Sequence, residues 1–435
     1  MATFFPSQMA VLAFSLIALR QAPAQTASAR VKLWTGQPLY VNGINVAWRN
    51  FANDVGNKPV DEAWFRSMLD GVKAAGGNSV RWWLFTNGAS APVFGSDGLV
   101  SGPGTATVAN IRKVLDLAEE RGIVVSLCLL SFDLFQPQAG VNAANNRKLM
   151  TTDAGIKAFI DNALVPVATA IGKHRGILCW EIFNEPEGMT ELGWTPEKVS
   201  MRDVQVFVNR AAGSIHRAVP GMIVSNGSWS FIASSEGVAG VKKQYYSDRE
   251  LIAAGGDAQG TLDFYMVHYY DWGKEAISPF HHPASYWKPD KPVVIGEFAA
   301  KGPYTGIDPV KAYGLLHENG YAGGLSWMYT GADGLGGINE AKAGMQAIAK
   351  LDPVGVTVIP DFRVSLADLP TAGRQMSRAA PAAGILIGNG IRFFGIEQTD
   401  FFAADGRSRP AIPGGSGAWS PFPSVPTPSR AIPAD

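Results

Sequence analysis

The sequence has little of what a disulfide framework, a metal site or an anionic partner would require. Its 435 residues include only two cysteines, Cys128 and Cys179, without metal-ligand spacing, and we expect both to be buried thiols. Lysine plus arginine equals aspartate plus glutamate, at 37 each, so there is no basic surplus for nucleic acid or anionic lipid. These absences favour a neutral partner and exclude a nucleic-acid or membrane-surface protein.

Long apolar runs are also missing. Beyond the amino terminus no stretch reaches 18 consecutive apolar residues, the length that a membrane-spanning helix needs. An apolar run from Met9 to Leu19, followed by A-x-A steps, makes residues 1–29 resemble a secretion signal, although no Lys or Arg precedes the run. We therefore expect a secreted or periplasmic protein that has no membrane association after the signal is removed.

Short apolar runs alternate with longer helical patterns, which is typical of a chain of βα units. The predicted strands are Leu39 to Val46, Ser79 to Leu84, Val124 to Leu130, Ile177 to Phe183, Met222 to Ser225, Phe264 to His268, Val293 to Glu297 and Gly324 to Met328. Helical patterns over 61–76, 106–122, 153–174 and 202–219 lie between them, whereas the fifth and sixth connections are less clearly helical.

Helix ends have recognisable signals. Asp61 and Thr105 are predicted N-caps, and Gly76, Gly122 and Gly176 are predicted stops.

Eight strands over residues 39–328 give about 36 residues per unit, which suits a (β/α)8 TIM barrel. The same alternation also suits an open doubly wound sheet. No G-x-G-x-x-G follows the first strand, so a dinucleotide-binding version loses support. We predict an α/β barrel as the catalytic domain over residues 30–351.

The carboxyl-terminal part differs in composition. Residues 352–405 contain a few strand-like segments, which would form a small extension or pack on the barrel. Residues 406–435 are rich in Pro, Gly and Ser and predict a disordered tail.

Polar side chains gather at or near the ends of the predicted strands, where the loops of a parallel barrel form the cavity. The candidate site residues there are Arg81, Asn184, Glu185, His268, Tyr270, Glu297 and Trp327. Glu181 and Glu187 flank Glu185 at alternate positions of "CWEIFNEPEG", so a strand would direct all three carboxylates to one side.

Two carboxylates at one barrel mouth suit glycosidic cleavage, in which one protonates the departing oxygen and the other faces the charge that develops at the anomeric carbon. Burial raises the pKa of a carboxyl and a guanidinium lowers it, so Arg81 would keep Glu297 ionised. His268 and Tyr270 would form hydrogen bonds near the pair, and Asn184 would donate to a sugar hydroxyl. This chemistry needs no metal and no cofactor.

The segments "WEIFNEP" and "VVIGEF" resemble the signature strands of glycoside hydrolase clan A, the retaining (β/α)8 enzymes. Glu185 in the first segment and Glu297 in the second are 112 residues apart. The resemblance spans residues 39 to about 350. It implies that Glu185 is the acid/base, that Glu297 is the nucleophile and that Trp327 forms the floor of the subsite for the attacked sugar. It also implies that Arg81, Asn184, His268 and Tyr270 support them. Glu181 and Glu187 match no catalytic position and would be bystanders.

Within the clan, "NSVRWWLFTNG" and "VHYYDW" look most like family 5, and particularly like its β-mannanases. Many family 5 cellulases have a histidine at the end of strand three, where this chain has "LLSFDLF". The resemblance therefore implies a monomeric endo-1,4-β-mannanase that cleaves a neutral β-linked polysaccharide, with an endo-β-1,4-glucanase as the alternative.

Two other functions stay open. A carbohydrate-binding barrel without turnover would keep the cleft but have it collapsed or blocked. A lyase or aldolase would use a Schiff-base lysine, for which Lys301 is the candidate nearest strand seven.

Overall fold

The computed structural model describes residues 29–237 and 243–359. The predictions for residues 1–28 and for most of the carboxyl-terminal extension, including the tail at 406–435, lie outside this part of the chain.

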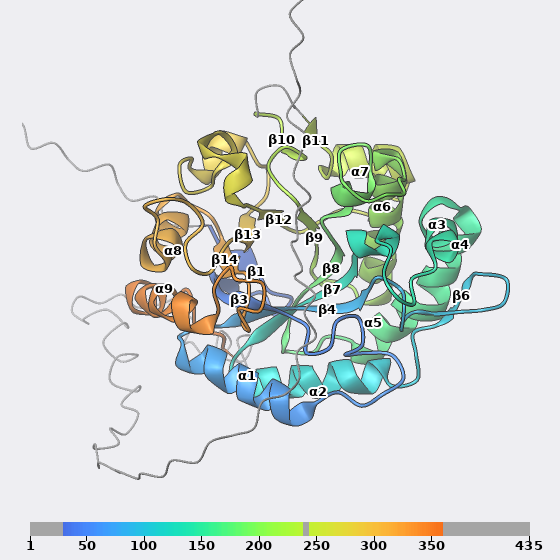
Figure 1. Ribbon diagram of the computed structural model, residues 1–435, viewed down its shortest axis with the longest axis horizontal. Coiled ribbons are helices and arrows are strands. Elements are labelled where there is room, and N and C mark those ends of the chain that lie inside the picture. Colours follow the sequence, from blue (N-terminus) through green and yellow to red (C-terminus); the bar gives the residue numbers. More distant parts are fainter. Residues whose placement is uncertain (1–28, 238–242, 360–435) are drawn as a thin grey trace, which may run out of the picture. The chain divides into compact units, whose positions relative to one another are not determined.

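Eight parallel strands form a closed barrel in the order β12-β13-β14-β3-β4-β7-β8-β9, as the alternation predicts (Figure 1). Its strands are β3 (Val41–Ala47), β4 (Ser79–Thr86), β7 (Val124–Ser131), β8 (Ile177–Asn184), β9 (Val224–Ser228), β12 (Tyr265–His268), β13 (Val293–Glu297) and β14 (Gly323–Ser326). Pairing of β14 with β3, through Leu325 and Gly43 among others, closes the ring and excludes the open doubly wound sheet.

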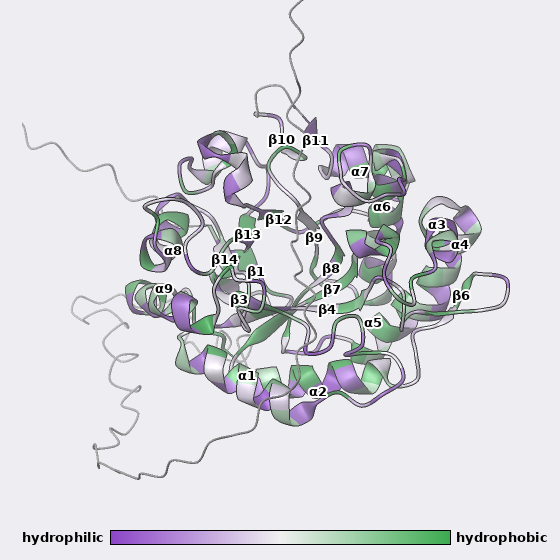
Figure 2. Ribbon diagram, viewed as in Figure 1, coloured by the Kyte–Doolittle hydropathy of each residue, from purple (hydrophilic) through white to green (hydrophobic). Residues whose placement is uncertain are grey.

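Helices surround the barrel (Figure 1). They are α1 (Glu62–Ala74), α2 (Thr107–Glu119), α3 (Ala143–Thr151), α4 (Asp153–Phe159), α5 (Val165–Ile171), α6 (Met201–Ala218), α7 (Asp248–Gly255), α8 (Pro309–Glu318) and α9 (Ile338–Leu351). Figure 2 shows apolar residues along the strands and alternating polar and apolar residues on helices such as α2, because each helix packs one face on the barrel.

Shorter elements complete the described chain. They are β1 (Val31–Lys32) with β2 (Pro38–Leu39), β5 (Val93–Phe94) with β6 (Val100–Gly102), β10 (Ser234–Ser235) with β11 (Lys243–Gln244), the π-helical turn η2 (Ile160–Leu164), and the 3-10 helices η1 (Phe132–Phe135), η3 (Pro186–Met189), η4 (Asp271–Gly273), η5 (Glu275–Ile277) and η6 (Ala284–Trp287). The sixth connection has only the 3-10 turns η4 to η6, which agrees with its weak helical pattern.

Several predicted boundaries are wrong by one to three residues. The fifth strand begins at Val224 rather than Met222, and the eighth ends at Ser326, before the predicted Met328. Asp61 is the predicted N-cap and accepts from the Trp64 backbone N–H at 3.1 Å, but α2 begins after Ala106 instead of Thr105.

The helix predicted over residues 153–174 ends early. It contains α4, η2 and α5, and Gly172, at a φ of +61°, ends it in place of Gly176. By length and apolar composition the run Asp153–Ile171 would suffice to cross a membrane. Phe159 in its middle packs against Phe85 and Phe207, so the apolar face of this run belongs to the core of the barrel domain.

The chain after α9 continues along the barrel for a few residues. The carbonyl of Gly355 accepts from the Tyr40 N–H at 2.8 Å, and that of Val356 accepts from the Asn78 side chain at 2.8 Å. Residues 352–359 therefore pack on the barrel, beyond the predicted domain end at residue 351.

Candidate active site

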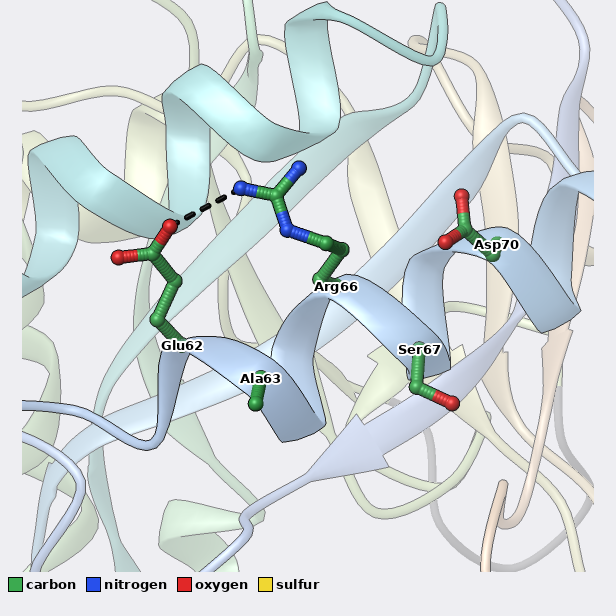
Figure 3. A pocket seen from close by; sticks show the side chains of 5 residues that line it. All are labelled: Glu62, Ala63, Arg66, Ser67 and Asp70. Atoms are coloured by element: carbon green, nitrogen blue, oxygen red, sulfur yellow. Dashed lines mark hydrogen bonds and ion pairs between the residues drawn. The ribbon is translucent and has the colours of Figure 1, made fainter.

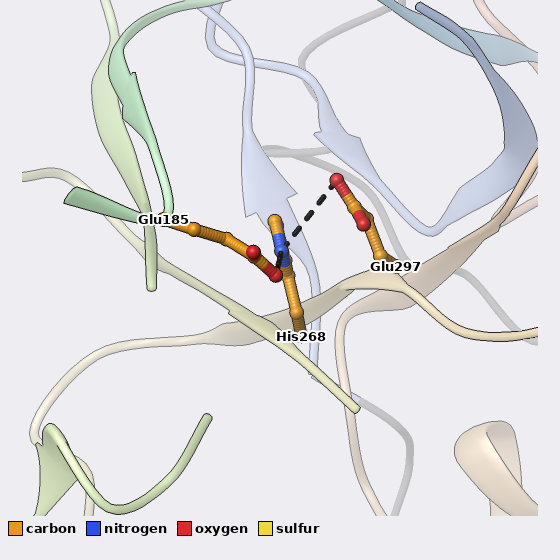
Figure 4. A group of neighbouring side chains, drawn as sticks. All are labelled: Glu185, His268 and Glu297. Carbon is orange, nitrogen blue, oxygen red and sulfur yellow. Dashed lines mark hydrogen bonds and ion pairs between the residues drawn. The ribbon is translucent and has the colours of Figure 1, made fainter. Parts of the chain in front are cut away.

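The carboxyl end of the barrel brings Glu185, His268 and Glu297 together (Figure 4). One ligand atom from each of the three lies within 4.8 Å of the others. Glu185 is 6% exposed and Glu297 4%, so both carboxyl groups are largely removed from water but still reach it.

Arg81 lies in the middle of β4 and uses all five of its N–H groups. Nη1 donates to Oε1 of Glu297 at 2.6 Å and to the Asn45 side chain at 3.0 Å. Nε and Nη2 donate to the two oxygens of Glu181 at 2.7 and 2.6 Å, and Nη2 also donates to Asn184 at 2.8 Å. The planar guanidinium thus fixes four side chains from three other strands.

The two carboxyl groups have different surroundings. Burial, then the nearby charges of Glu297 and Glu187, raise the pKa of Glu185 well above its usual range. Burial also raises the pKa of Glu297, to about 7, but the Arg81 guanidinium and the Tyr270 hydroxyl lower it. Tyr270 donates to Oε2 of Glu297 at 2.7 Å. As the pH rises, Glu297 therefore loses its proton before Glu185 does.

His268 contacts the carboxyl groups of both Glu185 and Glu297. Its Nδ1 is 2.9 Å from Oε1 of Glu185 and 3.5 Å from Oε1 of Glu297. Burial, with the Arg81 charge, lowers the pKa of His268 well below its usual value. The imidazole is therefore neutral and contacts Glu185 by hydrogen bonding rather than by a full ion pair.

Asn184 ends β8 and is oriented from both sides. Its Oδ1 accepts from Arg81, and its Nδ2 donates to the Ser131 hydroxyl at 3.2 Å. Ser131 in turn donates to Asp133 at 2.6 Å. Ser131 ends β7, the third strand of the barrel, and Asp133 follows it. They stand where many family 5 cellulases would have a histidine.

Trp327 follows β14 and joins an aromatic cluster with Trp48 and Trp83, at ring-centroid distances of 5.9 and 5.6 Å. Its indole N–H donates to Asp333, which fixes the ring. Beside this cluster, a hollow of about 660 Å³ runs from Tyr270 to Leu335 along the loop after β13. Tyr270, which donates a hydrogen bond to Glu297, is one of the residues that line this hollow.

A second hollow, of about 500 Å³, lies on the outer face of α1 (Figure 3). Glu62 and Arg66 in it form an ordinary ion pair at 3.0 Å, and Asp70 pairs with Arg121. It offers no convergent groups for catalysis.

Glu185, His268 and Glu297 are also close enough together to hold a metal ion. The Arg81 guanidinium, 2.6 Å from Glu297, already supplies a positive charge there and would repel a cation. The arrangement therefore suits proton transfer and nucleophilic attack better than metal binding.

Lys301 does not suit Schiff-base chemistry. Its side chain is exposed, and Nζ donates to the Gly334 carbonyl at 2.7 Å. A lysine activated for this chemistry is instead desolvated.

The structure brings all seven candidate residues to the barrel mouth, but it corrects the expectation for the carboxylates around Glu185. The side chains of Glu181, Glu185 and Glu187 do not all point to one side of a strand, because β8 ends at Asn184 and Glu185 has a left-handed φ of 45°. Glu181 faces Arg81, and Glu187 accepts from Tyr246.

The sequence motifs leave Glu181 a bystander and give Asn45 no role, yet both side chains accept hydrogen bonds from Arg81. An ionisable residue in the middle of the apolar strand "ILCWEIFN" requires a buried partner, and Arg81 within "SVRWWLFT" supplies the matching charge. That pairing was the signal available in the sequence. Cys128 and Cys179 are buried free thiols, as predicted.

The sequence model of the family described as cellulase (glycosyl hydrolase family 5) matches residues 36–304. The chain belongs to glycoside hydrolase family 5. This family 5 protein is therefore a glycoside hydrolase, and the resemblance seen in its strand-end motifs is confirmed.

Relatives of this family 5 enzyme include a mannan endo-1,4-beta-mannosidase from Mytilus edulis, 31% identical over 68% of this chain and 85% of that protein. Among solved structures, it is similar to the endo-1,4-beta-mannanase from Eisenia fetida, at 30% identity and a TM-score of 0.65, covering 72% of this chain and 91% of that one. It is also similar to the beta-1,4-D-mannanase from Cryptopygus antarcticus, at 27% identity and a TM-score of 0.67, covering 74% and 93%.

Proposed function

We propose that the protein is a retaining endo-1,4-β-mannanase that cleaves mannan or glucomannan by double displacement. The observation that carries the mechanism is the approach of the Glu185 and Glu297 carboxylate oxygens to within 4.8 Å. Retaining enzymes hold their carboxyl groups about 5–5.5 Å apart, whereas inverting enzymes need about 6.5–9.5 Å to admit a water molecule.

The different surroundings of the two glutamates assign their roles. In the first step an oxygen of Glu297 bonds to the anomeric carbon, the glycosidic C–O bond breaks, and the proton of Glu185 passes to the leaving oxygen. In the second step a water molecule attacks the same carbon, Glu185 takes its proton, and the Glu297 carboxylate is released. Glu185 is thus protonated at the start, as its higher pKa requires.

Arg81 and Tyr270 favour the ionised form of Glu297 and direct it at the anomeric carbon. In this proposal Asn184 donates to a hydroxyl of the attacked sugar, and Trp327 forms the floor beneath that sugar. Each of these interactions contributes most when charge develops in the transition state.

The preference for mannan rests on the relatives, since the protein from Mytilus edulis is a mannan endo-1,4-beta-mannosidase. The absence of a histidine at the end of strand three also favours this substrate over cellulose. The family description as cellulase makes an endo-β-1,4-glucanase the alternative. The proposal includes export by the amino-terminal segment, action as a monomer, and a neutral β-linked polysaccharide as the sole partner.

Release of reducing ends from galactomannan, glucomannan and soluble cellulose, with Glu297→Ala as the comparison, tests the substrate. We expect release from both mannans that disappears in the variant. Release from cellulose alone would keep the mechanism and move the substrate to β-glucan, and no release from any polymer would contradict the proposal.

A further inference from the structure

Glu187 is a buried carboxylate that the proposed reaction does not use. It is 0% exposed, and three neutral groups donate to it. Tyr246 Oη and Ser228 Oγ donate to Oε1 at 2.5 and 2.9 Å, and the backbone N–H of Trp229 donates to Oε2 at 3.2 Å. Within the described part of the chain no cation pairs with it. A buried carboxylate is costly compared with an apolar residue, which points to a specific role.

The contacts of Glu187 hold the turn that carries Glu185. The left-handed backbone of Glu185, at a φ of 45°, is unfavourable for a residue with a side chain and persists only where its surroundings enforce it. The Glu185 N–H donates to the Gly227 carbonyl at 2.7 Å, and the Glu187 side chain binds the next two residues of the same segment, Ser228 and Trp229. Residues 185–187 are thus tied to residues 227–229 at consecutive positions.

The space around this link is tight. A methyl group on Gly227 would lie 2.4 Å from Oε1 of Glu181 and 3.1 Å from Nη2 of Arg81. The end of β9 therefore lies directly against the Arg81–Glu181 pair and leaves no room for a side chain at Gly227.

The charge of Glu187 also acts on Glu185. Several titratable groups act on or contact the Glu185 carboxyl. They are Glu297 on β13, Glu187 on η3, Arg81 on β4, Asp133 on η1, His268 on β12 and Tyr270 after β12. A negative charge beside a carboxyl group disfavours its ionisation, so an ionised Glu187 contributes to the high pKa of Glu185, after burial and Glu297. Burial raises the pKa of Glu187 too, whereas the hydrogen bonds from Tyr246, Ser228 and Trp229 lower it and favour its ionised form.

We propose that Glu187 is a positioning residue for the acid/base: it fixes the turn that carries Glu185 and places a carboxyl group beside it. This inference rests on the proposed role of Glu185 and assigns a function to a residue that the sequence motifs leave out.

The test compares Glu187→Gln with the wild type on two substrates, β-1,4-mannan and a 2,4-dinitrophenyl β-mannobioside. Dinitrophenolate leaves without a proton, so kcat/KM for this substrate depends little on the acid. We expect kcat on mannan to fall about tenfold or more and kcat/KM for the aryl glycoside to fall much less. The alkaline limb of the kcat/KM profile on mannan should move to lower pH by about half a unit or more, because removal of the negative charge lowers the pKa of Glu185.

Two further variants separate charge from folding. Tyr246→Phe removes one donor and keeps the carboxyl group, so it should lower kcat on mannan more than kcat/KM on the aryl glycoside. The alkaline limb should move less than in Glu187→Gln, because loss of this hydrogen bond raises the pKa of Glu187 without removing its carboxyl group. Glu197→Gln makes the same chemical change as Glu187→Gln at an exposed residue of the β8–α6 connection, and should behave as wild type.

A folded Glu187→Gln variant that loses activity equally on both substrates, with an unmoved alkaline limb, would overturn the inference and leave Glu187 a structural role only. If Glu187→Gln does not fold, Tyr246→Phe decides: equal loss on both substrates, or no loss, overturns the inference. Wild-type protein that acts on neither substrate would instead overturn the proposed function itself.

Discussion

Arg81 donates a hydrogen bond of 2.6 Å from Nη1 to Oε1 of Glu297, its neighbour across the barrel mouth. Among the described residues Glu185 has no arginine or lysine partner and contacts the neutral His268 instead. Its carboxylate oxygen nevertheless lies within 4.8 Å of a carboxylate oxygen of Glu297. This asymmetry supports the proposed roles, with Glu297 as the ionised nucleophile and Glu185 as the protonated acid.

The two glutamates should respond differently to removal. Glu297→Ala should abolish turnover of every substrate, because no nucleophile remains. Glu185→Ala should lose about 10²–10⁴-fold in kcat/KM on mannan and much less on 2,4-dinitrophenyl β-mannobioside, whose leaving group needs no proton. Steady-state kinetics with both substrates measures this, and an equal loss in the two variants on the aryl glycoside would contradict the assignment.

Tyr270→Phe should shift the acid limb of the pH profile to higher pH. The Tyr270 hydroxyl stabilises the ionised form of Glu297, so its removal raises the pKa of Glu297, and a higher pH is then needed to ionise the nucleophile. The measurement is kcat/KM against pH. Tyr269→Phe, whose hydroxyl donates to the Lys274 carbonyl, is the matched control and should leave the limb in place. A shift to lower pH in Tyr270→Phe would refute the argument.

Glu181→Ala should lower the free energy of unfolding by about 3–5 kcal/mol, because it leaves the fully buried Arg81 without its two-oxygen partner. Glu197→Ala breaks an exposed pair with Arg147 and should cost less than about 1 kcal/mol. Urea unfolding of the two variants measures the difference. Equal costs would show that the Arg81–Glu181 pair does not support the barrel interior.

Trp272→Ala should raise KM for long mannan substrates with little change in stability. Trp272 is 37% exposed and stacks on Trp229, at a centroid distance of 5.0 Å and an interplanar angle of 22°. Such a pair offers a flat surface for a sugar ring. Tyr286→Ala, an exposed aromatic residue of the same connection, is the control. Unchanged KM in Trp272→Ala would exclude this surface from binding.

The barrel could be predicted from the sequence because eight apolar runs recur at a regular spacing, and because parallel strands place their carboxyl ends together. Glu185 and Glu297 were found in this way, as the reactive groups that follow the fourth and seventh runs. Strand limits were less accurate, since an apolar residue such as Met222 fits a buried turn as well as a strand.

The supporting contacts could not be read from sequence spacing. Glu187 meets Tyr246 only because the loops after β8 and β9 lie side by side, and no periodic pattern encodes that approach. Asn45 likewise reaches Arg81 through the pairing of β3 with β4. Such residues are recognisable only after the barrel is closed.

The configuration of the first sugar released from a β-1,4-mannooligosaccharide, followed by proton NMR, tests the double-displacement mechanism most directly. Two displacements at the same carbon predict that the β-anomer appears first and the α-anomer later, by mutarotation. First appearance of the α-anomer would show inversion and would contradict the role of Glu297 as nucleophile.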